Sequence, residues 1–159
     1  MKVGIIGCGK IAQVRHIPEY LENPDVEIVG YYDWNADRAA ELAAQFGGKA
    51  YSTEDELLAD KEMDAVSVCV ANNAHAKVTI KAADENGKYL MIGQNQRFAK
   101  AHVKAKELIS EGVIGDVITF KTTFGHGGPE TWGIDGAKNT WFFDKSRSVM
   151  GAMADRGVH

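Results

Sequence analysis

The sequence predicts an α/β fold in which a doubly wound parallel sheet carries helices on both faces. Apolar, β-rich runs alternate with segments of helical spacing as far as residue 92, and the turn after the first run is rich in glycine. Parallel strands need long crossover connections, usually helices, so this alternation indicates right-handed βαβ units. With 159 residues, 45% apolar and 25% charged, the chain has ordinary globular composition and can bury a core.

The predicted elements follow one another in a regular order, and turn residues mark their ends. Pro24 lies just beyond the first helix, the glycine pair 47–48 stops the second, and the Asn-Gly pair 86–87 stops the fourth. Thr53 and Glu56 have the three-residue spacing of a capping box at the start of the third. The elements are strands at 2–7, 26–32, 49–51, 65–70 and 89–92 and helices at 11–21, 36–46, 54–58 and 74–85.

The alternation stops in the second part of the chain. Its features are a polar helix at 100–111, a strand at 117–123 and a segment rich in glycine and aromatic residues at 124–141. We therefore expect a first domain at 1–98 and a second at 99–159. The second range holds only about sixty residues, which is close to the lower limit for a self-sufficient core, so we expect it to be the incomplete start of a domain.

Charge and composition exclude several classes of partner. The net charge is −4 and the pI is near 5.7, so the sequence predicts neither a nucleic-acid surface nor one for anionic lipid. The apolar start is too short for a signal sequence, and no run approaches the roughly 20 apolar residues that span a bilayer. We expect a cytoplasmic protein with a small-molecule partner. Cys8 and Cys69 lack C-x-x-C spacing and are expected to be buried, apolar and unpaired.

A glycine-rich turn joins the first predicted strand to the first helix. Its residues, Gly7-Cys8-Gly9-Lys10-Ile11-Ala12, fit the pattern G-x-G-x-x-A. The first glycine permits a tight turn, the second lets a pyrophosphate approach the backbone, and the alanine lets helix and strand pack closely. The anion would then meet the N–H groups and positive dipole end of the helix. A position directly after a strand and before a helix favours a dinucleotide site over an ordinary turn.

Asp33 is the second element of this predicted site. It lies about 20 residues beyond the turn, at the end of the second strand, where a carboxylate accepts hydrogen bonds from the adenosine ribose. The same charge repels a 2′-phosphate and no arginine follows immediately, so the sequence favours NAD over NADP. Trp34 is placed to flank the adenine. The alternative is that Asp33 merely caps the helix that begins near Ala36.

Several segments together resemble the glucose-fructose oxidoreductase / inositol dehydrogenase (Gfo/Idh/MocA) family along essentially the whole chain. They are 7–12, Asp33, Cys69–His75, Gly93–Phe98, Glu111–Asp116 and Asp155–His159. The resemblance implies a Rossmann domain followed by an α+β domain that carries substrate contacts and homo-oligomer interfaces. It also implies an NAD(P)-dependent dehydrogenase that transfers hydride between a sugar or cyclitol hydroxyl and the nicotinamide.

The resemblance assigns roles to four further residues. Asn72 and His75 would line the nicotinamide side of the cleft, although a helix-start histidine without a task is the alternative for His75. Asp155 and His159 would lie over the substrate, with His159 as the base that removes the hydroxyl proton and Asp155 orienting it. Their spacing of four puts them on one helix face, which an idle surface pair would also satisfy.

The chain departs from the family pattern in two places. The family carries Glu-Lys-Pro after its fifth strand, its lysine contacting substrate, whereas here residues 82–88 lead straight into a segment resembling the family's sixth strand. About one strand and one helix are missing, and we expect residues 89–92 to occupy the empty strand's place. The sequence also stops at His159, where the family's second sheet would begin. The alternatives to an enzyme are therefore a non-catalytic NAD-binding module or fragment, and a nonfunctional gene remnant.

Overall fold

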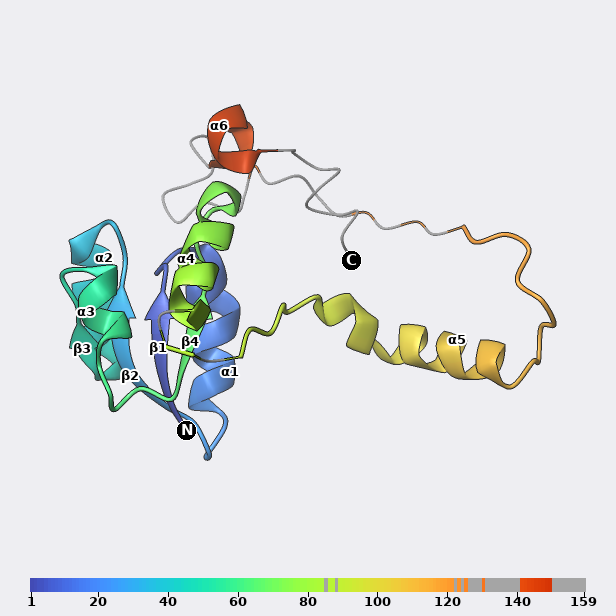
Figure 1. Cartoon of the computed structure of the whole chain (residues 1–159), viewed down its shortest axis with the longest axis horizontal. Helices are drawn as coiled ribbons and strands as arrows, with labels where there is room; N and C mark the ends of the chain where they lie inside the picture. Colours follow the sequence, from blue (N-terminus) through green and yellow to red (C-terminus); the bar gives the residue numbers. More distant parts are fainter. Residues whose placement is uncertain are drawn as a thin grey trace. The chain divides into compact units, whose positions relative to one another are not determined.

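A four-stranded parallel sheet forms the centre of the first part of the chain (Figure 1). Its strands are β1 (Lys2–Ile6), β2 (Glu27–Tyr32), β3 (Lys49–Ala50) and β4 (Ala65–Val68), in the spatial order β3-β2-β1-β4. Ile6 at the end of β1 is in register with Tyr32 on one side and Val68 on the other. The carboxyl ends of these three strands therefore meet at one edge of the sheet, and the predicted parallel α/β fold is confirmed.

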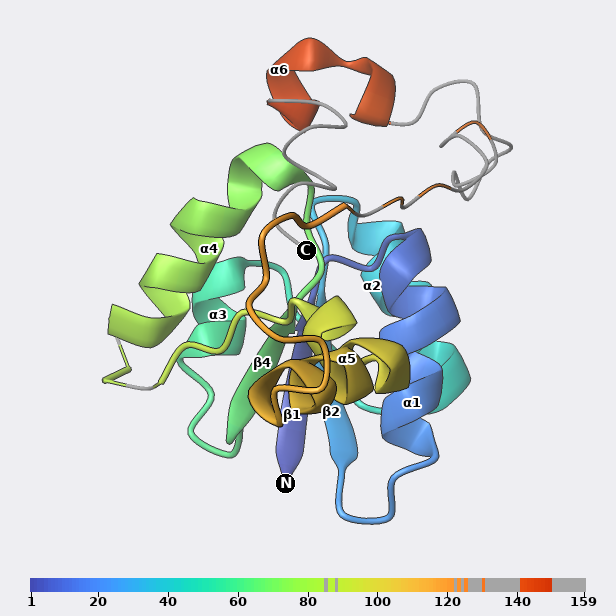
Figure 2. The same ribbon diagram turned by 90° about the vertical axis from the view of Figure 1, so that its right-hand side faces the viewer.

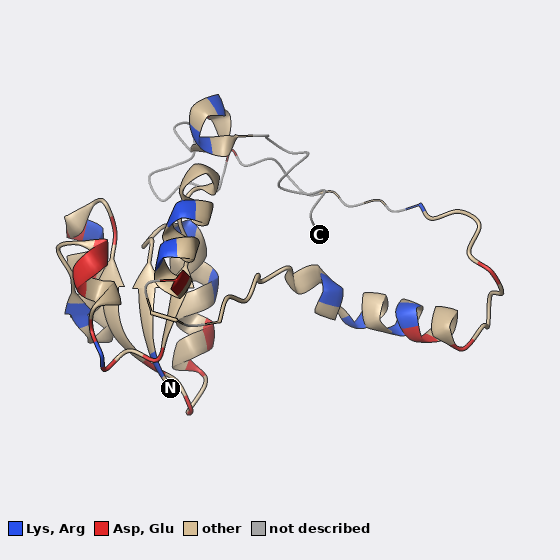
Figure 3. Ribbon diagram, viewed as in Figure 1, with Lys and Arg blue, Asp and Glu red and all other residues tan. Residues whose placement is uncertain are grey.

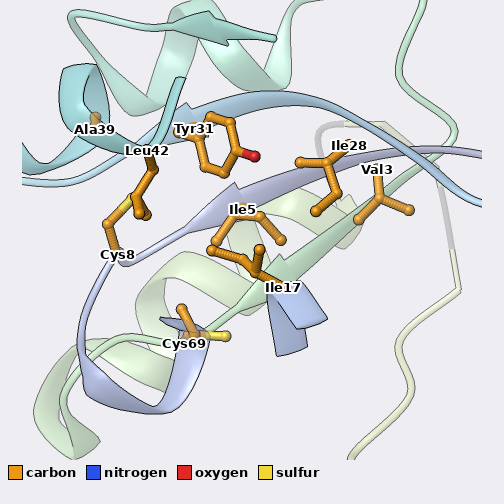
Figure 4. Close-up of a cluster of buried hydrophobic side chains, with 10 residues drawn as sticks. Val3, Ile5, Cys8, Ile17, Ile28, Tyr31, Ala39, Leu42 and Cys69 are labelled. Atoms are coloured by element: carbon orange, nitrogen blue, oxygen red, sulfur yellow. The ribbon is translucent and has the colours of Figure 1, made fainter. Parts of the chain in front are cut away.

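Helices cover both faces of this sheet, as the computed structural model shows in Figure 2. They are the π-helical turn η1 (Ala12–His16), α1 (Ile17–Leu21), α2 (Ala36–Phe46), α3 (Glu54–Leu58) and α4 (Asn72–Asp84). Neighbouring residues of β1 point to opposite faces, so Ile5 joins the core with Ile17 and Leu42 (Figure 4), while Ile6 joins the core with Leu57 and Val78. The sheet is doubly wound because each face has its own helical layer and core.

The helix ends largely agree with the sequence prediction. The Thr53 side chain accepts a hydrogen bond from the Glu56 N–H at 3.1 Å, and the Glu56 carboxylate accepts one from the Ser52 N–H at 3.1 Å. This is a capping arrangement whose return bond reaches one residue earlier than in the usual box. Gly47 and Gly48 follow α2 with φ of +82° and +90°, which favours glycine at both positions.

The structure describes residues 1–84, 86, 87, 89–121, 123, 125, 130 and 141–149. They fall into two units, of which the first lies within Met1–Leu90 and Pro129–Val149 and the second includes Met91–Gly128. The first unit also contains η4 (Trp141–Phe143) and α6 (Lys145–Ser148), and the second contains η2 (Asn95–Phe98) and α5 (Lys100–Ser110). No helix among these residues is long and apolar enough to cross a membrane.

Two predicted strands are wrong. Residues 89–92 are irregular, with Tyr89 fully exposed and Met91 79% exposed, so they do not take the place of a fifth strand. The described residues between 117 and 123 are likewise irregular, and Ile118 is 94% exposed. Both segments have the composition of strands, but a strand also needs a paired backbone and a covering layer. The fourth strand is also shorter than predicted and ends at Val68.

Candidate functional site

The glycine turn lies at the carboxyl end of β1, wedged between the ends of β2 and β4. Gly7 has φ of +95°, and a Cβ at this position would lie 2.6 Å from the carbonyl oxygen of Cys69. Its N–H donates to the carbonyl of Tyr32 at 2.8 Å. Backbone conformation and space both require glycine here, as the sequence indicated.

The second half of the turn is open toward solvent. A Cβ on Gly9 would meet nothing within 4 Å, and the helical backbone begins at the next residue. Lys10 and Ile11 are exposed, whereas Ala12 is fully buried against the sheet. The open backbone at the start of a helix is the arrangement that accepts a phosphate group, and the buried alanine gives the close packing expected of it.

Gln13, which was not predicted to be a site residue, stabilises the conformation of this turn. Its side-chain amide donates to the carbonyl of Cys8 at 2.9 Å, and its backbone N–H donates to the carbonyl of Gly9 at 3.2 Å. The helix therefore holds the turn through two hydrogen bonds before any ligand is present. No sequence spacing predicts this role for a glutamine, since the hydrogen bond from the Gln13 side chain to the Cys8 carbonyl depends on the local fold.

Asp33 lies at the end of β2 and is only 7% exposed. One carboxylate oxygen accepts from the Cys8 N–H at 2.7 Å and the other accepts from the Asn35 N–H at 2.9 Å. The cap of α2 is Asn35, whose side chain accepts from the Asp37 N–H, so the alternative that Asp33 is this cap is wrong. Each carboxylate oxygen has a second acceptor position, which leaves capacity for a ligand hydroxyl.

The surroundings of Asp33 contain a largely exposed indole ring and a positive charge. Trp34 is 77% exposed and follows Asp33 directly. Arg38, on the first turn of α2, is close enough to Cys8 for its charge to favour the thiolate. No arginine follows Asp33 immediately in the sequence, but α2 brings Arg38 back toward the turn, which the local sequence pattern did not indicate.

The two cysteines are buried and free, which confirms that prediction. Burial, and next the negative charge of Asp33, raise the pKa of Cys8 to about 12. Burial also raises the pKa of Cys69, against a smaller lowering by a hydrogen bond with Ser67. Both thiols therefore stay protonated near neutral pH and are unsuited to nucleophilic chemistry.

Asn72 and His75 lie on the first turn of α4, which follows the carboxyl end of β4. Both are half-buried. Burial lowers the pKa of His75, while a hydrogen bond with the backbone of Val70 acts in the opposite direction. The imidazole is therefore biased toward its neutral form at pH 7.

Asn72 also connects α4 to a distant part of the chain. Its amide nitrogen donates to the carbonyl of Ser148 at 3.4 Å, and Ser148 is only 6% exposed. Asp155 and His159 lie outside the described residues. Among the residues that the structure describes, no cluster of histidine, cysteine and carboxylate side chains could hold a metal ion.

Together the parallel sheet, the open glycine turn and the buried acid at the end of β2 define a dinucleotide-binding Rossmann unit. The profile of the Gfo/Idh/MocA oxidoreductase family, described as an NAD-binding Rossmann fold, matches residues 1–94. The profile of a C-terminal domain of the same family matches residues 102–159. The chain belongs to the Gfo/Idh/MocA oxidoreductase family.

Three curated relatives illustrate the similarity. An uncharacterized oxidoreductase of Streptococcus pneumoniae is 32% identical over 74% of this chain and 38% of its own length. Myo-inositol 2-dehydrogenase of Thermotoga maritima is 29% identical over 72% of this chain and 42% of its own length. D-glucoside 3-dehydrogenase of Escherichia coli is 25% identical over 100% of this chain and 51% of its own length. The chain thus spans about two fifths to one half of these relatives.

Solved structures agree on the fold. An NAD-binding protein from Listeria innocua matches with a TM-score of 0.72 at 23% identity, over 99% of this chain and 52% of its own. A 3-ketoreductase from Actinomadura kijaniata, solved with NADP, matches with a TM-score of 0.63 at 26% identity, over 73% and 45% of the two chains. Neighbours of this fold therefore include complexes with NADP.

The alignment lengths also bear on the missing segment. The match to the Escherichia coli relative takes in the whole of this chain yet runs over 187 positions. Because this chain has 159 residues, the alignment contains at least 28 positions, 187 less 159, that only the relative fills. This total, summed over the whole alignment, is comparable with the length of one strand and one helix with their connections.

Proposed function

We propose that the chain binds NAD at the carboxyl edge of the sheet. The residues present fit the cofactor: the backbone from Gly9 to Ala12 would receive the pyrophosphate, with Lys10 beside it. The single observation that carries the proposal is the buried Asp33 carboxylate, which is fixed by the Cys8 N–H and retains acceptor capacity for a ribose hydroxyl.

NAD is the cofactor that we propose over NADP. A 2′-phosphate bound beside Asp33 would place two negative charges together in a poorly solvated position. Arg38 favours NADP instead, because its positive charge acts on the same turn and would attract a 2′-phosphate. We infer that Asp33 decides the preference, since it is more buried than Arg38 and lies directly at the end of β2.

We further propose that the chain is part of an NAD-dependent dehydrogenase acting on a sugar or cyclitol hydroxyl. The bound cofactor would supply the hydride acceptor. Asn72 and the neutral His75 would line the nicotinamide side, and His159, oriented by Asp155, would take the hydroxyl proton. Residues 1–98 would form the cofactor domain and residues 99–159 the start of the substrate and oligomerisation domain.

A non-catalytic NAD-binding module is the second candidate. It is favoured by residues 89–98, which contain no lysine to replace that of Glu-Lys-Pro and whose first four residues are exposed rather than paired with the sheet. Both candidates require the same cofactor site and differ only in chemistry.

NADH titration of the full chain, followed by fluorescence, tests the cofactor site. We expect Asp33→Ala to weaken binding by roughly tenfold or more, as loss of charge-assisted hydrogen bonds does. Asp37→Ala is the matched control, because it removes an exposed carboxylate of the same helix end and should change the affinity by less than about twofold. Equal affinities of the two variants would overturn the assignment.

A turnover assay distinguishes the dehydrogenase from the non-catalytic NAD-binding module. A dehydrogenase reduces NAD with at least one polyol of a panel, and His159→Ala should abolish that activity while NADH binding persists. NADH binding without turnover on any polyol favours the module.

A further inference from the structure

Helix α6 packs on the amino-terminal end of α4 (Figure 1). The contact is specific, because the Asn72 amide donates to the Ser148 carbonyl across 76 positions of sequence and Ser148 is buried. Under the proposed function Asn72 lies at the nicotinamide side of the cleft. The segment 141–149 therefore lies beside the place where a substrate must meet the cofactor.

This segment carries two positive charges, Lys145 and Arg147 (Figure 3). The nearby acid, Asp144, caps α6, and its carboxylate accepts from the N–H and hydroxyl of Ser146 at 2.9 and 2.6 Å. These hydrogen bonds, and to a smaller extent the charge of Arg147, lower the pKa of Asp144. The carboxylate is thus engaged by the helix cap itself.

Arg147 is half-buried yet forms no ion pair with any residue that the structure describes. A guanidinium group that loses part of its hydration gains most from a bidentate phosphate or carboxylate. The whole chain has a net charge of −4, which would repel such an anion, so two neighbouring cations that form no ion pair with any described residue are significant.

An aromatic pair adjoins these cations. The rings of Trp141 and Phe142 stack with centroids 3.9 Å apart and an angle of 22° between their planes, and both residues are half-buried. They belong to η4, which packs against α6. A flat apolar surface beside a cation suits a sugar ring that carries an acidic substituent.

We propose that the substrate carries an anionic group, a phosphate or a carboxylate, which Arg147 binds with the help of Lys145. Trp141 and Phe142 then contact the apolar face of the ring. This inference rests on the proposed function, because it uses the nicotinamide side of the cleft to locate the substrate.

Calorimetric titration of the NADH-saturated full chain tests the inference with three probes. D-glucose 6-phosphate, D-glucuronate and D-glucose share a ring and differ in charge. We expect one or both anionic probes to bind at least tenfold more tightly than D-glucose at about 20 mM salt, with the tighter one identifying phosphate or carboxylate. The preference should shrink at about 0.5 M salt, because partly exposed charges are screened.

Substitutions test whether Arg147 and Lys145 cause the preference for anionic probes. Arg147→Gln should reduce it about tenfold, Lys145→Gln about threefold, and Arg147→Lys should retain part of it, since charge stays while the bidentate fork is lost. Lys106→Gln is the matched control, an exposed cation on α5 that should leave it unchanged. NADH affinity should be the same in all four variants.

Equal binding of charged and neutral probes, a preference insensitive to salt, or an unchanged preference in Arg147→Gln would each overturn the inference. The salt series uses only the wild-type chain, so it decides the question even where Arg147→Gln fails to fold. If the wild-type chain does not bind NADH, the proposed function fails separately, and titration of the free chain with the same probes still tests the anion site.

Discussion

The two glycines of the turn should separate folding from cofactor binding. At Gly7 an alanine would need φ of +95° and would place its Cβ 2.6 Å from the Cys69 carbonyl oxygen. The left-handed conformation costs a residue with a side chain about 1–2 kcal/mol, and a forced contact in a packed region costs about 1–3 kcal/mol. Gly7→Ala should therefore lower the free energy of unfolding by about 2–5 kcal/mol, a large part of the usual 5–15 kcal/mol.

Gly9→Ala gives the opposite pattern. Its Cβ meets no protein atom within 4 Å, so we expect the stability to change by less than about 1 kcal/mol. The same methyl group occupies the space proposed for the pyrophosphate, and NADH affinity should fall about 10- to 100-fold, equivalent to about 1.4–2.8 kcal/mol.

Urea unfolding and NADH fluorescence titration measure the two quantities on the same preparations. A loss of about 2–5 kcal/mol in Gly7→Ala corresponds to a melting temperature lower by roughly 8–40 °C for a domain of about 100 residues. The reasoning is refuted if Gly9→Ala unfolds as readily as Gly7→Ala, or if Gly9→Ala binds NADH as tightly as the wild-type chain.

Three further predictions concern titration, capping and thiol access. Burial lowers the pKa of His16 and His75 below the ordinary 6.5, so the unfolded chain binds more protons. Stability should be complete above about pH 6.5 and should fall as the pH drops through the lowered values; a urea midpoint that rises on acidification from pH 7 to 5.5 would contradict this. Asn35→Ala removes the cap of α2 and should cost about 1 kcal/mol in urea unfolding, whereas an unchanged midpoint would show that water replaces it. Cys8 and Cys69 should react with a thiol reagent only at the rate of unfolding, and rapid labelling in the native state would disprove their burial.

Local signals in the sequence predicted the glycine turn and the position of Asp33 at the end of β2. Gly7, Gly9 and Asp33 lie at strand ends, where the requirements of turn geometry act within a few residues. The roles assigned to them as cofactor ligands stay predictions. Asn35 was not predicted as the cap of α2 because Asp33, two positions earlier, is also a common capping residue. The sequence alone did not show that the Asp33 carboxylate accepts a hydrogen bond from the Cys8 N–H.

Features that depend on distant partners could not be predicted. Residues 89–92 have the apolar pattern of a strand, but pairing depends on a neighbouring edge and a covering helix, which a local pattern does not supply. The contact between Asn72 and Ser148 joins residues 76 positions apart, and no periodicity links them. Arg147 was not predicted as a substrate-binding residue for the same reason, since only the packing of α6 on α4 brings it near the proposed nicotinamide side of the cleft.

The two halves of the proposed cleft differ in how they are built, which bears on the choice between enzyme and module. The turn and Asp33 are fixed by hydrogen bonds within the first 38 residues, apart from the packing of Gly7 on Cys69. The nicotinamide side depends on residues 141–149, which reach α4 from far along the chain. Cofactor affinity should therefore survive changes in residues 141–149 that abolish chemistry. A chain that lacks the Glu-Lys-Pro segment can keep its NAD site intact, and the anionic probe and turnover assays, rather than NADH binding, will decide whether the nicotinamide side is assembled for catalysis.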